Sequence, residues 1–104
     1  EVGEDGARME QELAALCRRS GVRLLGPNCL GVIDTSSGLN ASFAGAMPEP
    51  GGIAVFSQSG ALCTAMLDMA RGRHLGLSKL VSIGNKADIS EVDLLQALAE
   101  DRAT

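Results

Sequence analysis

Aromatic side chains are scarce in this sequence. Its 104 residues include two Phe, no Tyr and no Trp, which gives an aromatic content of 2%. Because each buried ring supplies a large share of the apolar area in a core, an independent domain of this length usually contains more of them. The shortage is a first indication that the chain belongs to a larger folded body.

Other absences exclude several classes of function. With 9 basic and 13 acidic residues the net charge is −4, and no basic stripe with interleaved aromatic residues argues for nucleic-acid binding. No apolar run reaches the roughly 20 residues that span a bilayer, and the first residues are acidic, unlike those of a signal peptide. Cys17, Cys29 and Cys63 have no C-x-x-C spacing, so we expect neither a zinc site nor a disulfide framework. These features predict a cytoplasmic protein with no metal, no nucleic-acid partner and no membrane partner.

The first part of the chain begins with a predicted amphipathic helix over residues 4–20. Its apolar positions recur at i, i+4, i+7 and i+8, at Met9, Leu13, Leu16 and Cys17. Gly21 suits the left-handed position that follows a helix, so the helix is expected to end there. Residues 22–25 are then a short strand candidate, which stops at the sequence Gly26-Pro27-Asn28.

Residues 29–51 have a less regular pattern. Residues 30–33 are a second short strand candidate, and residues 35–38 have the composition of a turn. Residues 47–52 are rich in Pro and Gly, as is typical of a linker or crossover. We therefore predict a domain boundary between about residues 35 and 51.

A sharper unit follows this boundary. Residues 53–56 form a continuous apolar run, which is typical of a strand buried on both faces of a parallel sheet. The turn Ser57-Gln58-Ser59-Gly60 leads into a predicted helix over residues 61–73. That helix is expected to bury the face that carries Leu62, Met66, Met69 and Ala70.

The same alternation continues to the end of the sequence. Residues 80–83 are the next predicted strand, and Ser90 with Asp93 three residues later predicts a capped final helix. The order strand, helix, strand, helix argues for an α/β fold with an open parallel sheet. Such a sheet needs more strands than these residues supply, so we expect the chain to be truncated at both ends.

Three glycine motifs fall at the predicted strand ends, where open α/β sheets bind their ligands. They are Gly26-Pro27-Asn28-Cys29-Leu30-Gly31, Ser57-Gln58-Ser59-Gly60 and Gly84-Asn85-Lys86. In the second motif a strand runs directly into a helix, whose N-terminus can hold a phosphoryl group through free N–H groups and the positive end of its dipole. The alternative is an ordinary turn that uses Ser as a cap and Gly for the bend.

Single reactive residues carry weaker signals. Cys29 is a candidate nucleophile, but no His or Asp lies at a diagnostic spacing, so a small buried residue is the favoured interpretation. His74 follows two arginines at the tail of a predicted helix, where a cation suits the helix dipole. We therefore interpret His74 as a surface residue. Lys86 is either an anion ligand or a solvated loop residue.

Taken together, the three motifs resemble those of a known family. Gly26-Pro27-Asn28-Cys29-Leu30-Gly31, then the stretch 52–62 around Ser57-Gln58-Ser59-Gly60, then Ser82-Ile83-Gly84-Asn85-Lys86-Ala87-Asp88 are similar in order and spacing to NDP-forming acyl-CoA synthetases. These enzymes are related to the α subunits of succinyl-CoA synthetase. The sequence Leu39-Asn40-Ala41-Ser42-Phe43 also resembles the acetyl-type members.

This resemblance implies an architecture and a set of site residues. Residues 1–34 would be the last part of a Rossmann-like CoA-binding domain, residues 35–51 a connection, and residues 52–104 the start of a flavodoxin-like ligase domain. Ser57, Gln58, Ser59 and Gly60 would face the phosphate or a phosphohistidine. Asn28 and Cys29 would lie near the thiol end of CoA, and Gly84 and Asn85 would border the acyl site.

The resemblance also implies a reaction and its partners. Acyl-CoA and phosphate would exchange through an acyl phosphate, and a histidine would carry the phosphoryl group to Mg-ADP on an ATP-grasp domain or subunit. The partners would be CoA, a small carboxylic acid and the remainder of the same chain, in an oligomer. The phosphohistidine motif and the glycine-rich CoA turn are missing from this sequence, so the chain alone is predicted to be inactive. Thr64 stands where succinate-type α subunits have a tyrosine, which argues against succinate.

Two other functions stay open at this point. The first is the acetyl-CoA-sensing body of a protein lysine acetyltransferase, in which a ligase-like body is fused to a GNAT domain. Gly60 favours the ligase, because some of those bodies lose this glycine. The second is a free-standing CoA- or phosphate-binding module, which the incomplete sheet makes less favourable.

Overall fold

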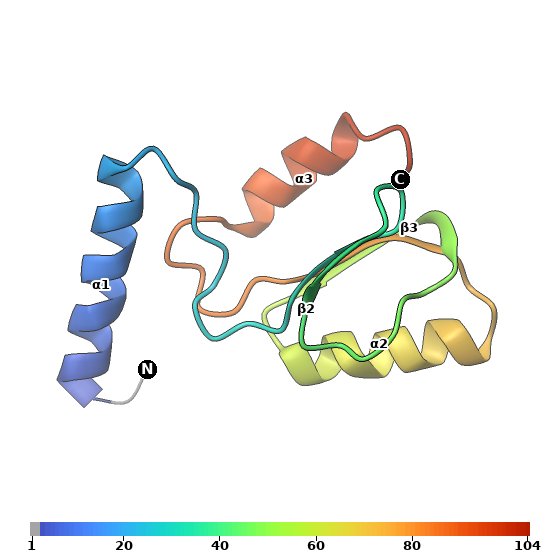
Figure 1. The fold of residues 1–104 in the computed structure, drawn as a ribbon, viewed down its shortest axis with the longest axis horizontal. Coiled ribbons are helices and arrows are strands. Elements are labelled where there is room, and N and C mark those ends of the chain that lie inside the picture. Colours follow the sequence, from blue (N-terminus) through green and yellow to red (C-terminus); the bar gives the residue numbers. More distant parts are fainter. Residues whose placement is uncertain (1–2) are drawn as a thin grey trace.

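The computed structural model describes residues 3–104, so that Glu1 and Val2 of the predicted segment 1–34 lie outside the described residues. The elements are α1 (Gly3–Arg19), β1 (Gly31–Asp34), β2 (Leu39–Ser42), β3 (Pro50–Ser57), α2 (Gly60–Gly72), β4 (Leu77–Ser82) and α3 (Glu91–Ala99). Figure 1 shows α2 and α3 on opposite sides of the sheet and α1 beyond one end of it. The predicted α/β class is confirmed.

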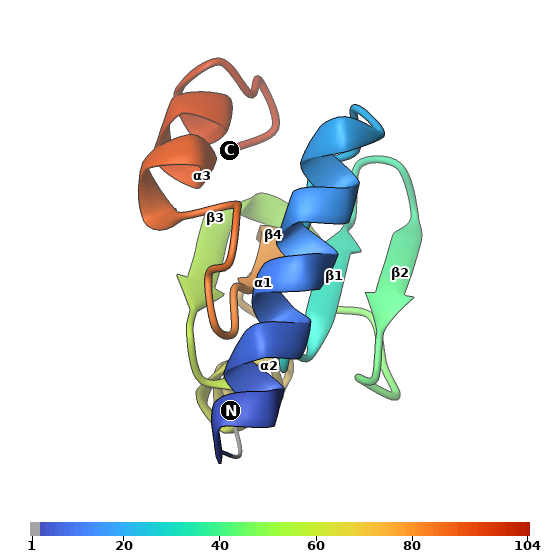
Figure 2. The same ribbon diagram turned by 90° about the vertical axis from the view of Figure 1, so that its left-hand side faces the viewer.

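The four strands form one open sheet in the order β2-β1-β4-β3 (Figure 2). Strands β3 and β4 are parallel, with Val55 opposite Leu80, as the strand–helix–strand pattern predicts. Strand β1 is antiparallel to β4, and β2 is antiparallel to β1. The sheet is therefore mixed, and β2 is a strand that the sequence did not predict. Strands from both sides of the expected domain boundary share this sheet, and the division into 1–34, 35–51 and 52–104 stays a prediction.

The strand directions bring four chain segments to one edge of the sheet. Parallel β3 and β4 both end there, at Ser57 and Ser82. Because β1 runs the other way, it begins at this edge, at Gly31. Because β2 reverses direction again, it ends at the same edge, where Ser42 pairs with Gly31. Residues that flank these four strand ends are consequently neighbours in space.

Strand β4 is an interior strand of the sheet, and β3 is an edge strand. Five of the six residues of β4 are buried, because strands lie on both sides of it. The expectation that residues 53–56 are buried on both faces is wrong for this chain. Strand β3 pairs only with β4, and Ile53 is 49% exposed. The continuous apolar run arises here in an edge strand rather than in a central one.

The core lies between α2 and the sheet. Ile33, Cys63, Leu67 and Leu80 form its buried cluster, and Leu30, Ala44 and Val55 pack against it. The predicted buried face of α2 is partly wrong, because Cys63, Leu67 and Ala70 are its buried residues, whereas Leu62 and Met69 are exposed. Apolar residues surround most of this helix, so its period alone does not select a face. The small Cys63 and Ala70 allow the helix to approach the strands closely.

The outer helices confirm two further expectations and correct one. Helix α1 spans nearly the predicted residues, and Ser90 caps α3, with the Asp93 carboxylate accepting hydrogen bonds from the Ser90 N–H and hydroxyl. Residues 22–25, however, form no strand. The Leu24 N–H donates to Asp88, and its carbonyl accepts from Ile89, so a loop takes the place of a partner strand.

Within residues 3–104, no helix is long and apolar enough to cross a membrane.

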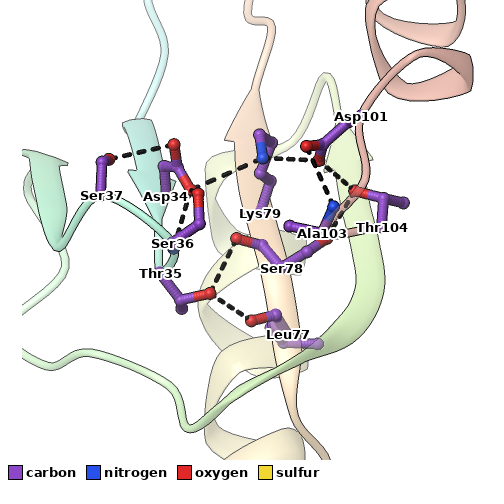
Figure 3. Close-up of polar contacts among 10 residues, drawn as sticks. All are labelled: Asp34, Thr35, Ser36, Ser37, Leu77, Ser78, Lys79, Asp101, Ala103 and Thr104. Atoms are coloured by element: carbon purple, nitrogen blue, oxygen red, sulfur yellow. Dashed lines mark hydrogen bonds and ion pairs between the residues drawn. The ribbon is translucent and has the colours of Figure 1, made fainter.

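A polar cluster at the other edge of the sheet attaches the C-terminal segment (Figure 3). The Lys79 ammonium lies 2.6 Å from Asp101 and 3.5 Å from Asp34. Asp34 also accepts hydrogen bonds from Ser36 and Ser37, and those hydroxyl groups hold its pKa at about 2. The hydrogen bond from Lys79 lowers the pKa of Asp101, and the same contact raises the pKa of Lys79. Charged groups thus bind β1, β4 and the end of the chain together.

This cluster predicts that acid weakens the fold of the chain. A carboxyl group whose pKa is lower in the folded state stabilises that state above its unfolded pKa and loses the effect as the pH falls through its folded pKa. We expect the urea midpoint of the 104-residue chain, followed by circular dichroism, to fall steadily from pH 5 to pH 2. Asp34→Asn should lower the midpoint at pH 5 and make its pH dependence shallower. An equally steep dependence in the variant would contradict this assignment.

Candidate functional site

The candidate site begins at the N-terminus of α2. Ser59 caps this helix, and its Oγ accepts the N–H of Leu62 at 3.2 Å. The Ser57 Oγ in turn accepts the N–H of Ser59 at 3.1 Å. A serine hydroxyl that accepts a backbone N–H can still donate its own proton. The turn therefore presents two hydroxyl groups and the first N–H groups of a 13-residue helix at one place.

A hollow of about 660 Å³ lies in front of this turn. Its lining combines residues from three segments: Asn28, Cys29, Leu30, Phe43, Gln58, Ser59 and Gly60. Gly60 approaches Leu30 closely, since a Cβ atom at Gly60 would lie 3.4 Å from the Leu30 Cβ atom. The structure thus brings together two of the predicted groups, Asn28 with Cys29 and Gln58 with Ser59 and Gly60. Ser57 precedes these residues in the chain, at the end of β3, and is not part of the lining.

The third predicted motif lies against the first rather than in the hollow. The Asn85 N–H donates to the Pro27 carbonyl at 2.9 Å, and the Asn28 side-chain amide lies 3.5 Å from the Asn85 side-chain oxygen. Gly84 has φ +59, and a Cβ atom there would collide with the carbonyl oxygens of Pro27 and Asn28. Gly84 and Asn85 therefore support the loop that carries Asn28, one step away from the hollow.

The two weaker candidates, Cys29 and His74, lie in different places, and only Cys29 lines the hollow. The Cys29 thiol lies 3.8 Å from the Leu25 carbonyl oxygen, and the residue is half-buried. His74 follows α2 at its far end, is largely exposed, and lies 2.8 Å from the Glu49 carboxylate. Since the sequence has one histidine, this chain brings no imidazole to the hollow. Within residues 3–104, His, Cys, Asp and Glu side chains form no group of three that could hold a metal ion.

Charges near the third motif are paired with each other. The Lys86 ammonium lies 2.8 Å from Glu91, and this hydrogen bond lowers the pKa of that carboxyl group. Hydrogen bonding to Arg23 likewise lowers the pKa of Asp88. The side-chain amide of Asn85 donates to Glu10 of α1 at 2.7 Å. The contacts of Arg23 and Asn85 connect the first part of the chain to the loop after β4. Lys86 pairs with Glu91 and is not among the residues that line the hollow.

Sequence reasoning missed two of the residues that line the hollow. Leu30 stood in the first glycine motif and in a strand candidate without a role of its own, and Phe43 stood only in a family resemblance. Phe43 comes directly after β2, the strand that was not predicted. Its signal was available, because it is one of two Phe residues and stands among small and polar neighbours, where an aromatic ring has no local packing partner.

Comparison with known proteins agrees with this geometry. The family model described as the succinyl-CoA ligase like flavodoxin domain matches residues 50–104. This chain belongs to that family. The family resemblance that the motifs around Ser57 and Gly84 indicated is therefore confirmed.

Individual relatives of this flavodoxin-like domain extend the match over the whole chain. The acetate–CoA ligase [ADP-forming] I of Archaeoglobus fulgidus is 48% identical over 104 residues, which are 100% of this chain and 15% of the relative. The α subunit of acetate–CoA ligase [ADP-forming] I of Pyrococcus furiosus is 45% identical over 100% of this chain and 22% of that subunit. The chain therefore spans less than a quarter of the length of these relatives.

A solved structure agrees with the fold. The dinucleotide-forming acetyl-coenzyme A synthetase 1 of Candidatus Korarchaeum cryptofilum, in complex with phosphate and ADP, superposes with a TM-score of 0.92 at 39% identity. The match covers 99% of this chain and 22% of that one. The mixed sheet and the two flanking helices are therefore shared with a solved member of the group.

The contact between the two loops predicts a specific effect of substitution at Gly84. Gly84→Ala introduces both a strained positive φ and a collision with the Pro27 and Asn28 carbonyl groups. We expect it to lower the free energy of unfolding by about 2–3 kcal/mol, measured by urea denaturation of the chain.

Gly38→Ala is the matched control. Gly38 has φ +71, but a Cβ atom there would have no neighbour within 4 Å. This variant should lose only the backbone contribution, about 1 kcal/mol. Equal losses in the two variants would show that the approach of the two loops adds nothing to stability.

Proposed function

We propose that this chain forms the phosphate-facing part of an ADP-forming acyl-CoA ligase. Such an enzyme interconverts acyl-CoA, ADP and phosphate with a carboxylic acid, CoA and ATP. The observation that carries the proposal is the hollow in which Gln58, Ser59 and Gly60 at the start of α2 face Asn28 and Cys29. The likeness to relatives named acetate–CoA ligase [ADP-forming] supports it.

The α2 N-terminus would bind the phosphoryl group. The helix dipole and the first N–H groups favour a negative charge at this position. Ser57 and Ser59 would each donate a hydroxyl proton to a phosphate oxygen, since both oxygens already accept a backbone N–H. Gly60 would let the phosphate approach the backbone closely, because it has no side chain at the first position of the helix. These three residues, with Gln58 between the two serines, would stabilise charge without taking part in bond making.

The proposed reaction has three balanced steps. Phosphate attacks the acyl carbon of acyl-CoA, and the CoA thiol leaves with a proton, which gives an acyl phosphate. A histidine nitrogen then takes the phosphoryl group and releases the carboxylic acid. ADP finally accepts the phosphoryl group from the phosphohistidine and becomes ATP. That histidine would come from outside these residues, since His74 lies at the other edge of the sheet, beside Glu49.

The remaining parts of the site follow from the same proposal. Asn28 and Cys29 would lie near the thiol end of CoA, and Gly84 with Asn85 would hold the loop at the acyl site. Mg-ADP or Mg-ATP would bind on an ATP-grasp domain or subunit, in a cytoplasmic oligomer. Acetate or another small acid is the proposed acyl donor. The lysine acetyltransferase alternative receives no support from the relatives described above, which are named as ligases.

Phosphorylation of the full-length protein that carries this sequence tests the proposal. We expect radiolabelled ATP to leave acid-labile, base-stable phosphate on the protein, and CoA with acetate to discharge it. Ser57→Ala should slow the labelling about tenfold or more, because a hydrogen bond to a charged oxygen contributes about 1.5–3 kcal/mol. Ser59→Ala should slow it at least as much, since it also removes the helix cap.

Ser20→Ala is the control, because Ser20 is exposed at the end of α1, outside the hollow. It should be labelled at the rate of the unaltered protein. A protein that takes up no label, or three serine variants with the same rate, would contradict the assignment of this turn to the phosphoryl group.

A further inference from the structure

The inference concerns Phe43, whose side chain is 89% exposed. A phenylalanine ring is among the least favourable groups to leave in water, so such exposure is unusual for a residue in a well-ordered turn. Phe43 also lines the hollow, together with Gln58, Ser59 and Gly60. It is the largest apolar side chain there, beside the smaller Leu30 and Cys29.

The turn around Phe43 is rigidly built. The Phe43 N–H donates to the Leu30 carbonyl at 3.0 Å. On either side of it, the Ser42 Oγ accepts the Ala44 N–H at 3.1 Å, and the Asn40 side-chain amide donates to the Ala44 carbonyl at 3.2 Å. The Ser42 hydroxyl also donates to the Asn40 side-chain oxygen at 2.6 Å.

The next residue anchors this turn to the core. Ala44 packs against the cluster that includes Cys63 of α2 and Ile33 of β1. The backbone on both sides of Phe43 is therefore fixed, while the ring itself faces the hollow. The exposed ring thus extends from a built turn rather than from a loose loop, and it shares the hollow with the α2 N-terminus.

The hollow consequently has two chemically different sides. Hydroxyl and N–H donors lie at the start of α2, and the Phe43 ring with Leu30 and Cys29 supplies the apolar part of the lining. An acyl phosphate or acyl thioester has the matching shape, with charge at one end and a hydrocarbon tail at the other. Donors oriented by Ser57 and Ser59 suit the charged end, and Phe43 suits the tail.

We infer that Phe43 is a specificity-determining residue, which contacts the acyl group and limits its size to short, apolar acids. This inference rests on the proposed ligase function and deepens it. With the Phe43 ring in the lining of the hollow, a second carboxylate on the acid would meet an apolar surface without a hydrogen-bond partner. A longer or branched tail would need the space that the ring occupies.

The test compares acids of increasing size on the full-length protein that carries this sequence. The rate of acyl-CoA formation from ATP and CoA is measured with acetate, isobutyrate, hexanoate, phenylacetate and succinate. Phe43→Ala should raise the kcat/KM ratio of phenylacetate or hexanoate to acetate by about tenfold or more, the range that pocket size produces. Phe43→Trp should lower the same ratio, which keeps the inference testable if the smaller residue disturbs the turn.

Leu39→Ala is the matched control, because Leu39 is also an exposed apolar residue of the β2 hairpin but does not line the hollow. Its order of acids should equal that of the unaltered protein. Equal ratios in all three variants, with an active unaltered protein, would overturn the inference and leave the ligase proposal intact. An unaltered protein that is inactive with every acid would overturn both.

Discussion

The two-sided pairing of β4 is the constraint on which the rest of the structure depends. β3 pairs with it in parallel and β1 antiparallel, so the end of β4 lies beside the end of β3 and the start of β1. A fully buried hydroxyl fixes this meeting point, because the Ser82 Oγ accepts the N–H of Leu30 at 3.0 Å. If β1 ran parallel to β4, Leu30 would lie at the opposite edge. The hollow in front of α2 would then lose the wall that Leu30 and Phe43 provide.

Local signals were sufficient to predict most helices and the parallel pair. Ser59 and Ser90 mark the helix starts by capping chemistry that involves residues within a few positions, and the strands around α2 are apolar runs. Strand β2 was missed for a physical reason. Its residues, Leu39–Ser42, alternate between apolar and polar side chains over four positions only, and three of the four are exposed, so the pattern is too short to stand out. The pairing with β1 makes this segment a strand, and that pairing depends on residues elsewhere in the chain.

The sequence predicted part of the candidate site, and the residues that it missed depend, like β2, on how the strands pair. The rule that ligands bind at the carboxyl ends of strands correctly places Ser57 and Gly84 at one edge. Asn28 and Cys29 lie at that edge for a different reason, since they precede β1, which runs against its neighbour β4. The predicted strand over residues 22–25 does not exist, so the correct location followed from an incorrect element. Phe43 follows β2, so its place in the hollow depended on a strand that was not predicted, although its isolated aromatic ring was a signal in the sequence.

The polar groups at the two edges of the sheet make different kinds of contact. At one edge Lys79, Asp34 and Asp101 satisfy one another, and the charges serve to hold the chain together. At the other edge the oxygens of Ser57 and Ser59 accept backbone N–H groups, which fixes their position and leaves their protons free to donate. Hydrogen bonds of the first kind stabilise the fold, whereas those of the second kind fix the Ser57–Gly60 turn, of which Gln58, Ser59 and Gly60 line the hollow. Because the strand directions separate the two edges by the full length of β4, the stabilising charges do not compete with a ligand for the donors of α2.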